Sequence, residues 1–192
     1  MEVQEAHEQA EKAHEKHNKR AALIIIGLAA LLAICEMAGK HAQTSSIAYN
    51  IEANDLWAFY QARTIRSTIL RTAIETAELL PADDAPEHAE ARQKRIAAWQ
   101  KTADRYESDP STGEGRKELG DRAKATMELR DHKLAVYHHF EYASAALQLA
   151  IVMASAAIIT EFVLLEVVSA GLGVVGLAFA LVGWFAPMLF KL

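Results

Sequence analysis

The side chains of this 192-residue sequence with the clearest capacity for metal chemistry are three histidines near its start, His7, His14 and His17. Glu11 and His14 form an E-x-x-H spacing, which would place both side chains on one face of a helix. A di-iron helical bundle requires two such motifs and two further carboxylates on facing helices, and this tail supplies one. We therefore expect a solvated, charged helix here, with metal binding by Glu11 and His14 as an alternative, and no cofactor.

Motifs of nucleophilic or nucleotide chemistry add no candidate. The chain has no G-x-S-x-G and no Walker loop, and His14 and His17 are one residue too close together for an H-E-x-x-H motif. Cys35 is the one cysteine and lies inside an apolar run, where we expect a small apolar filler rather than a redox thiol. We therefore expect that the protein is not an enzyme.

The elements that carry these residues are indicated by the separation of charged from apolar side chains. Apolar residues make up 52% of the chain, charged residues 23%, and the net charge is −5. Ala21–Ala38 is an apolar run interrupted only by Glu36, and the charged residues of Ala143–Phe190 are Glu161 and Glu166. Because a helix of ~20 residues spans ~30 Å of hydrocarbon, both stretches can cross a bilayer. The composition excludes an ordinary soluble domain, a disulfide scaffold and, by the sign of its charge, a nucleic-acid binder.

The pattern predicts an all-α membrane protein with three transmembrane helices and an elongated, coiled-coil-like helical domain outside the membrane. Lys16, Lys19 and Arg20 lie directly before the first apolar run and favour a cytoplasmic N-terminus, with that run retained as a signal anchor. The helical domain between the first and second spans then lies outside the cytoplasm. The expected segments are a charged tail at 1–20, spans at 21–38, 143–160 and 167–190, and the extramembrane domain at 39–142.

Helices are expected throughout the extramembrane domain, because apolar residues recur there at spacings of three and four. Pro81–Pro86 and Ser108–Gly113 predict two breaks, and Asp84 with Glu87 predicts a capping box at the start of the second helix. The third helix has no breaker before the second span, so we expect it to continue unbroken. The apolar seam expected for the first helix consists of Ala58, Ala62, Ile65, Ile69, Thr72, Thr76 and Leu79.

A family resemblance is carried by two strings, Asp55-Leu56-Trp57-Ala58-Phe59-Tyr60-Gln61-Ala62-Arg63 and Leu147-Gln148-Leu149-Ala150-Ile151-Val152-Met153-Ala154-Ser155. With the single anchor and its His/Glu-rich tail, their order resembles the bacterial membrane proteins grouped as domain of unknown function 4337. The resemblance implies a bacterial inner-membrane protein with three spans and no known activity. Relatives often carry Arg after the Thr that ends the second span, whereas Glu161 follows Thr160 here.

The most specific part of this resemblance is the first string, with Asp55, Trp57, Phe59, Tyr60, Gln61 and Arg63 as its signature. At ~1.5 Å per residue, its aromatic side chains are too far beyond the first span for an interfacial belt. We expect Trp57, Phe59 and Tyr60 to pack against other helices of the domain or against a neighbouring subunit.

One polar cluster is expected at the outer membrane boundary. Glu36 lies about one helical turn inside the first span, and the antiparallel second span brings Gln148 and Ser144 to a similar depth. A carboxylate in hydrocarbon needs a partner or becomes protonated, and snorkelling to the headgroups is the alternative. We expect Glu36 to face inward and bond to Gln148, to Ser144 or to one of the boundary histidines, which are His41, His138 and His139.

Small residues favour close helix packing in all three spans, because they let backbones approach in lipid. We expect the stripe of the last span to serve self-association, and the role to be structural or accessory, as a homo-oligomer or a subunit of a larger membrane complex. Alternatives are an oligomeric pore and a metal-binding protein that uses the tail histidines. The stripe consists of Ser169, Gly173, Gly176, Ala180 and Gly183.

Overall fold

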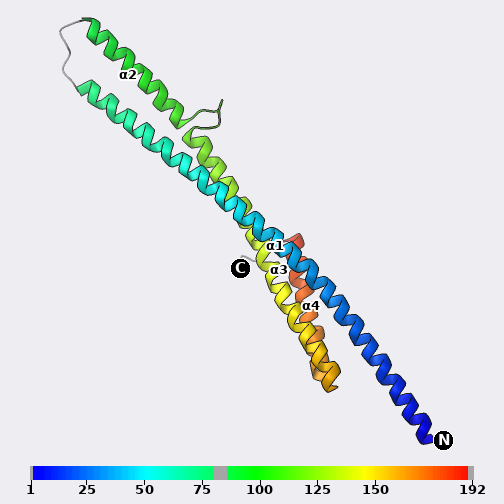
Figure 1. Cartoon of the computed structure of the whole chain (residues 1–192). Coiled ribbons are helices and arrows are strands. Elements are labelled where there is room, and N and C mark those ends of the chain that lie inside the picture. Colours follow the sequence, from blue (N-terminus) through cyan, green and yellow to red (C-terminus); the bar gives the residue numbers. More distant parts are fainter. Residues whose placement is uncertain (1, 80–85, 190–192) are drawn as a thin grey trace. The chain divides into compact units, whose positions relative to one another are not determined.

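A computed structural model describes the backbone of residues 2–79 and 86–189, and the side chains of residue 19 and of residues 21–79 and 87–189. Within these ranges the chain is helical and has no strand. The four helices are α1 (Glu2–Leu79), α2 (Pro86–Glu107), α3 (Arg116–Thr160) and α4 (Val163–Phe185) (Figure 1). Three of them, α1, α3 and α4, are long and apolar enough to cross a membrane.

The predicted helix boundaries agree with the structure at several points. The third predicted helix and the second apolar run form one continuous helix, α3, as expected. The loop predicted at Ser108–Gly113 separates α2 from α3. The capping box predicted at Asp84 and Glu87 includes a residue outside the described range, although Glu87 lies in the first turn of α2.

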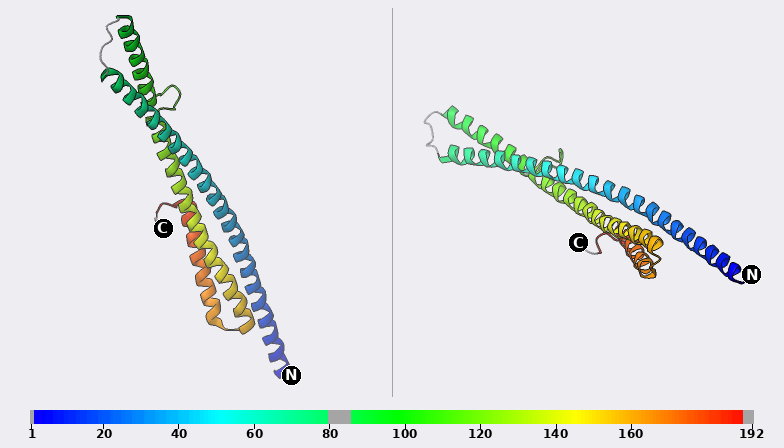
Figure 2. Two further views of the ribbon diagram at one scale, coloured as in Figure 1. Left: turned by 60° about the vertical axis from the view of Figure 1, so that its left-hand side comes forward. Right: turned by 60° about the horizontal axis from the view of Figure 1, so that its bottom comes forward.

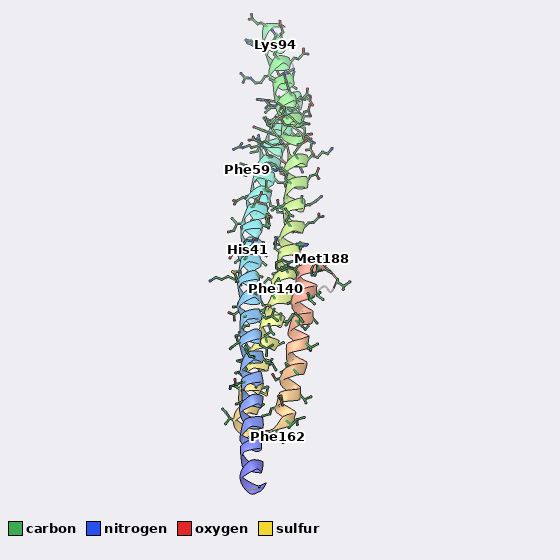
Figure 3. All side chains as sticks on the ribbon, turned by 90° about the vertical axis from the view of Figure 1, so that its right-hand side faces the viewer. His41, Phe59, Lys94, Phe140, Phe162 and Met188 are labelled. Atoms are coloured by element: carbon green, nitrogen blue, oxygen red, sulfur yellow. The ribbon has the colours of Figure 1, made fainter. Side chains whose placement is uncertain are left out.

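The chain forms two compact units, of which the first combines Met1–Ser46 with Asp131–Leu192. In this unit α4 lies along the last part of α3, with the first part of α1 beside them (Figure 2). Phe140, labelled in Figure 3, belongs to the buried core of this unit together with Cys35, Ala143, Leu147 and Ala180. Cys35 is therefore a packed side chain.

The turn between α3 and α4 is shorter than the break expected at 161–166. Glu161 adopts a left-handed backbone conformation (φ 54°) and Phe162 is the N-cap of α4. As a result α4 starts at Val163 and ends at Phe185, whereas the third span was expected at 167–190. A single left-handed residue reverses the chain here, so that Glu166 becomes part of the first turn of the helix.

The second unit is Ile47–Arg130, in which α2 lies beside the last part of α1. Leu56, Leu119 and Ala123 form its buried core, with Trp57 and Tyr60 packed against them. Ala103 of α2 is also buried, and Trp99 and Tyr106 on the same face of that helix are half-buried. Apolar side chains of α2 and of the start of α3 therefore contribute to the packing of this unit.

The seam predicted for α1 is wrong. Ile65 and Ile69 are 60% and 61% exposed, and Leu79 is 86% exposed. The face of α1 that packs carries Tyr60 and Arg63. Tyr60 packs its ring and Arg63 the aliphatic part of its side chain, while the hydroxyl and the guanidinium form hydrogen bonds. Such a face looks polar in the sequence. Its buried members are Ala53, Leu56, Ser67 and Ile74.

Candidate functional site

The candidate site is a groove of the first unit between α1 and α3, which we call the boundary groove. Gln148 Nε2 donates a hydrogen bond to Glu36 Oε1 at 3.0 Å, so the structure pairs these two residues. A Cβ built on Gly39 would lie 3.2 Å from Phe140 Cβ, so the two helices approach closely there. The groove has a volume of about 410 Å³ and also contains Lys40, Glu141 and Ser144.

Glu36 does not face inward as expected, because its side chain and that of Gln148 are exposed on the surface of the unit. Its neighbour Cys35 occupies the buried position, and Gly39 continues that packed face. On a helix, adjacent residues point about 100° apart. Glu36 therefore bonds to Gln148 across the mouth of the groove instead of inside the core.

The three boundary histidines do not join this pair. His139 is 1% exposed, and its Nε2 lies 3.1 Å from the carbonyl oxygen of Pro187 beyond α4. A carbonyl can only accept, so Nε2 carries the proton and donates. His138 Nδ1 faces Glu141 Oε2 at 3.4 Å, whereas His41 is exposed on α1. The expected cluster is thus divided among three places.

Glu141 forms a second polar contact at the end of the groove opposite Gln148. The hydroxyl of Tyr137 donates to Glu141 Oε1 at 3.1 Å, and this hydrogen bond raises the pKa of Tyr137 above its usual 10.0. The groove therefore combines carboxylates, amides and one ammonium group over apolar side chains. It therefore offers mixed polar recognition.

The small residues of α4, for which self-association was expected, pack against other helices of the same chain. A Cβ built on Gly176 would lie 2.7 Å from Leu147 Cγ, and one on Gly183 would lie 2.9 Å from His139 Cβ. The hydroxyl of Ser169 donates to the carbonyl of Ala150 at 2.8 Å. Ser169, Gly176, Ala180 and Gly183 are buried, and Gly173 approaches Leu28 of α1.

The glycines of α4 also form a G-x-G-x-x-G string, Gly171, Gly173 and Gly176, which the reasoning from sequence missed. In dinucleotide-binding proteins this string forms the turn between a strand and a helix. Here all three glycines lie inside α4. The string therefore serves helix packing and gives no phosphate-binding loop.

The family signature has a packing role in the second unit. Trp57 Nε1 donates to Met127 Sδ at 3.4 Å, and Tyr60 stacks edge-on against Trp57 with ring centroids 5.3 Å apart. Arg63 pairs with Glu114 and lies 4.9 Å above the ring of Tyr106. The three signature aromatics were expected to pack against other helices of the domain or against a neighbouring subunit. Trp57 and Tyr60 pack within the unit, whereas Phe59 is 63% exposed, and Asp55 and Gln61 are exposed as well (Figure 3).

The loop between α2 and α3 is held against this signature face. Arg116 donates to Glu107 Oε2 at 2.8 Å and to the Tyr60 hydroxyl at 3.1 Å, and the bond to Tyr60 raises the pKa of Arg116. Glu118 accepts from the Ser108 hydroxyl at 2.6 Å and from the Asp109 backbone N–H at 3.1 Å. The carboxylate of Glu118 thus closes the loop onto the first turn of α3.

Asp109 gives this loop a specific acid sensitivity. Hydrogen bonds from the Ser111 hydroxyl and the Arg105 guanidinium lower the pKa of Asp109 from 3.8 to about 2. Because the pKa falls on folding, ionised Asp109 favours the folded loop above pH 3.8, and this contribution is lost as the pH falls through about 2. The wild-type loop should therefore lose stability as the pH falls from about 4 to about 2. We expect this loss to be smaller in Asp109→Asn, because asparagine does not titrate.

Hydrogen exchange of the loop amides at pH 2 to 5, by mass spectrometry, measures this effect. Asp121→Asn, an exposed position on α3, is the matched control for the change in net charge. An equal pH dependence in wild type and Asp109→Asn would contradict the assignment.

The tail residues Glu11 and His14 lie in the helical range of α1, but outside the residues whose side chains are described. Among the described residues, no group of three or more His, Cys, Asp or Glu side chains could hold a metal ion.

Comparison with known proteins identifies one family. No curated protein and no solved structure matches the chain. A family described as "Domain of unknown function (DUF4337)" matches residues 17–186, a range that contains α2, α3, α4 and most of α1, with both strings quoted above. The chain therefore belongs to the DUF4337 family.

Proposed function

We propose that the chain is a non-catalytic protein of the bacterial inner membrane that assembles with copies of itself through an exposed face of α1. The three helices that are long and apolar enough to cross a membrane support its place in the bilayer. Lys16, Lys19 and Arg20 before the first apolar run favour a cytoplasmic N-terminus, with the second unit in the periplasm.

The observation that carries the proposal is a mainly apolar stripe on the part of α1 that belongs to the second unit. Its members recur at spacings of three and four, and at 3.6 residues per turn they fall within an arc of about 80°. Its isoleucines Ile47 and Ile51 are 56% and 57% exposed, similar to Ile65 and Ile69. The α1 stripe consists of Ile47, Ile51, Asn54, Ala58, Ala62, Ile65 and Ile69.

A second copy of the chain is the occupant that suits this stripe. The steps of three and four residues are those of a coiled-coil seam with one irregularity, two consecutive steps of four at Asn54–Ala58–Ala62. Such a seam is one helix wide and is covered by another helix. Copies in one bilayer leave it in the same direction, so their α1 stripes are parallel and in register. In a parallel pair, the positions that flank the seam meet between copies, Asn50 with Asp55 and Gln61 with Arg66. Neither of these pairs brings two like charges together.

Asn54 is the one polar member of the α1 stripe, and it favours the same arrangement. A single asparagine in a coiled-coil seam fixes the register at a cost in stability, because its amide needs a polar partner across the seam. In a parallel pair in register, that partner is Asn54 of the other copy, and the amide group both donates and accepts. A shift of one copy by a turn would place Asn54 against Ile51 or Ala58 instead.

We expect the double variant Ile65→Lys, Ile69→Lys to convert a dimer or larger particle into a monomer, because each buried isoleucine contributes about 2 kcal/mol and two lysines would repel their counterparts. Mass photometry of the full-length protein in nanodiscs measures the particle size. The matched control is Phe59→Lys, Leu129→Lys, which changes two exposed apolar residues outside the stripe. A monomeric wild type, or an equal response of both variants, would contradict the proposal.

Disulfide trapping tests the parallel register. In a Cys35→Ala background, Ala58→Cys should crosslink to itself, because both copies carry the residue at the same height, whereas Glu52→Cys outside the stripe should not. A membrane-impermeant maleimide should label Glu52→Cys, whose thiol stays free outside the stripe, once the outer membrane is permeable and with the inner membrane intact. Protection from the reagent would reverse the topology without removing the pairing.

A further inference from the structure

The boundary groove holds polar groups that the chain itself leaves without partners. Lys40 forms no ion pair with any described residue, although it shares the groove with Glu141. Ser144 is 9% exposed, and its hydroxyl has no hydrogen-bond partner. Unpaired polar groups of this kind are costly next to hydrocarbon, so a ligand that joins them is favoured.

The polar groups follow one another along the groove in a fixed order. Since α1 and α3 run antiparallel, the series begins with Gln148 beside Glu36, continues with Ser144 and Lys40, and ends with Glu141. From Gln148 to Glu141 the helix rises by about 10 Å. With the proposed spans, Gln148 lies deepest in the bilayer and Glu141 at its outer surface.

We infer that the boundary groove binds the headgroup of a phospholipid with a primary ammonium group, phosphatidylethanolamine. The order of groups in this lipid, from depth to surface, is ester carbonyl, phosphate and ammonium. Gln148 retains a second amide hydrogen for the ester carbonyl, Lys40 supplies the cation for the phosphate, and Glu141 supplies the anion for the ammonium. Rotation of the Ser144 hydroxyl adds a donor to the phosphate.

The charges of the groove distinguish this lipid from the other common headgroups. Glu36 and Glu141 outnumber Lys40, so an anionic headgroup such as phosphatidylglycerol meets repulsion. A choline headgroup has no N–H to donate to Glu141, which still has acceptor capacity beside its bonds to Tyr137 and His138. The groove volume of about 410 Å³ suits a headgroup, with the acyl chains left in the bilayer.

This inference rests on the proposed membrane spans and is independent of the pairing through the α1 stripe. Native mass spectrometry of the detergent-solubilised full-length protein, with the three lipids added at equal concentration and with identical acyl chains, measures retention on any oligomeric species. We expect phosphatidylethanolamine to be retained about tenfold more than phosphatidylcholine or phosphatidylglycerol, as for the loss of one charge-assisted bond. Absence of the chain from the membrane fraction would contradict the proposed membrane spans, and this result is distinct from a failure to bind the lipid.

Two variants test which side chain binds the phosphate and which binds the ammonium group of the headgroup. Lys40→Gln should lower retention of phosphatidylethanolamine about tenfold, and Glu141→Gln should remove the preference over phosphatidylcholine while binding persists. Lys133→Gln and Glu128→Gln, outside the groove, are the charge-matched controls, and circular dichroism verifies that every variant is folded. Equal retention of all three lipids by the wild type, or a preference for phosphatidylglycerol, would overturn the inference.

Discussion

Replacement of Gly176 by leucine is expected to destabilise the packing of α4 on α3 by about 3 kcal/mol, which is the upper part of the usual range for overpacking. A Cβ alone would lie 2.7 Å from Leu147 Cγ and 3.1 Å from the carbonyl oxygen of Ala143. Leu147 is fully buried in the core of the first unit, so it cannot move aside without displacing Phe140 and Cys35. At a few degrees per kcal/mol for a chain of this size, the Tm should fall by about 10 °C.

Thermal unfolding of the full-length protein in detergent measures this change. Gly171→Leu is the matched control on the same helix, because no atom lies within 4 Å of a Cβ built there. We expect its Tm to change by no more than about 2 °C, as is usual for a surface position. If Gly176→Leu left the Tm unchanged but reduced the particle size, the small stripe of α4 would have to be reassigned to a contact between copies.

The small stripe illustrates what periodicity can establish. The spacing of Ser169, Gly176, Ala180 and Gly183 correctly identified a face built for close approach, and these residues are buried. It could not identify the helix on the other side, because small residues fit a helix of the same chain as well as a helix of another copy. The structure assigns this face to Leu147 and His139 of α3.

The α1 stripe shows the opposite error. Ile65 and Ile69 were expected to pack inside the extramembrane domain, because apolar residues usually face a core. Tyr60 and Arg63 occupy that place instead, through bonds to Arg116 and Glu114 that join residues more than fifty positions apart. Contacts of such separation leave no local trace in the sequence. Ile65 and Ile69 therefore belong to the exposed α1 stripe, on which the proposed self-assembly rests.

The depth of Gln148 relative to Glu36 was accessible from the sequence, since two antiparallel helices of known rise fix it to within about a turn. The orientation of Glu36 was not, because the choice between Cys35 and Glu36 for the packed position depends on where Phe140 meets Gly39. The same contact separates the histidines, because His139 next to Phe140 faces α4 and reaches Pro187.

Gly115→Ala is expected to open the loop that joins α2 to α3. A Cβ at this position would lie 2.7 Å from Ser108 Cα, and closer still to the backbone nitrogen of Asp109 and to Glu118 Oε2. Two of these three atoms belong to the backbone, so a change of side-chain rotamer cannot relieve the clash. The bonds from Ser108 and Asp109 to Glu118 should then be lost, at a cost of about 2–3 kcal/mol to the closed loop.

Gly120→Ala makes the same chemical change five residues later and should have the opposite sign. A Cβ there lies 3.6 Å from the Tyr60 ring, which is an ordinary contact, and alanine favours a helix interior by about 0.5–1 kcal/mol over glycine. Hydrogen exchange of the amides of residues 108–119 should accelerate at least tenfold in Gly115→Ala and slow or stay unchanged in Gly120→Ala. Protection in Gly115→Ala equal to that of the wild type would mean that the loop does not close onto Glu118, and Arg116 would then lose the support that holds it against Tyr60.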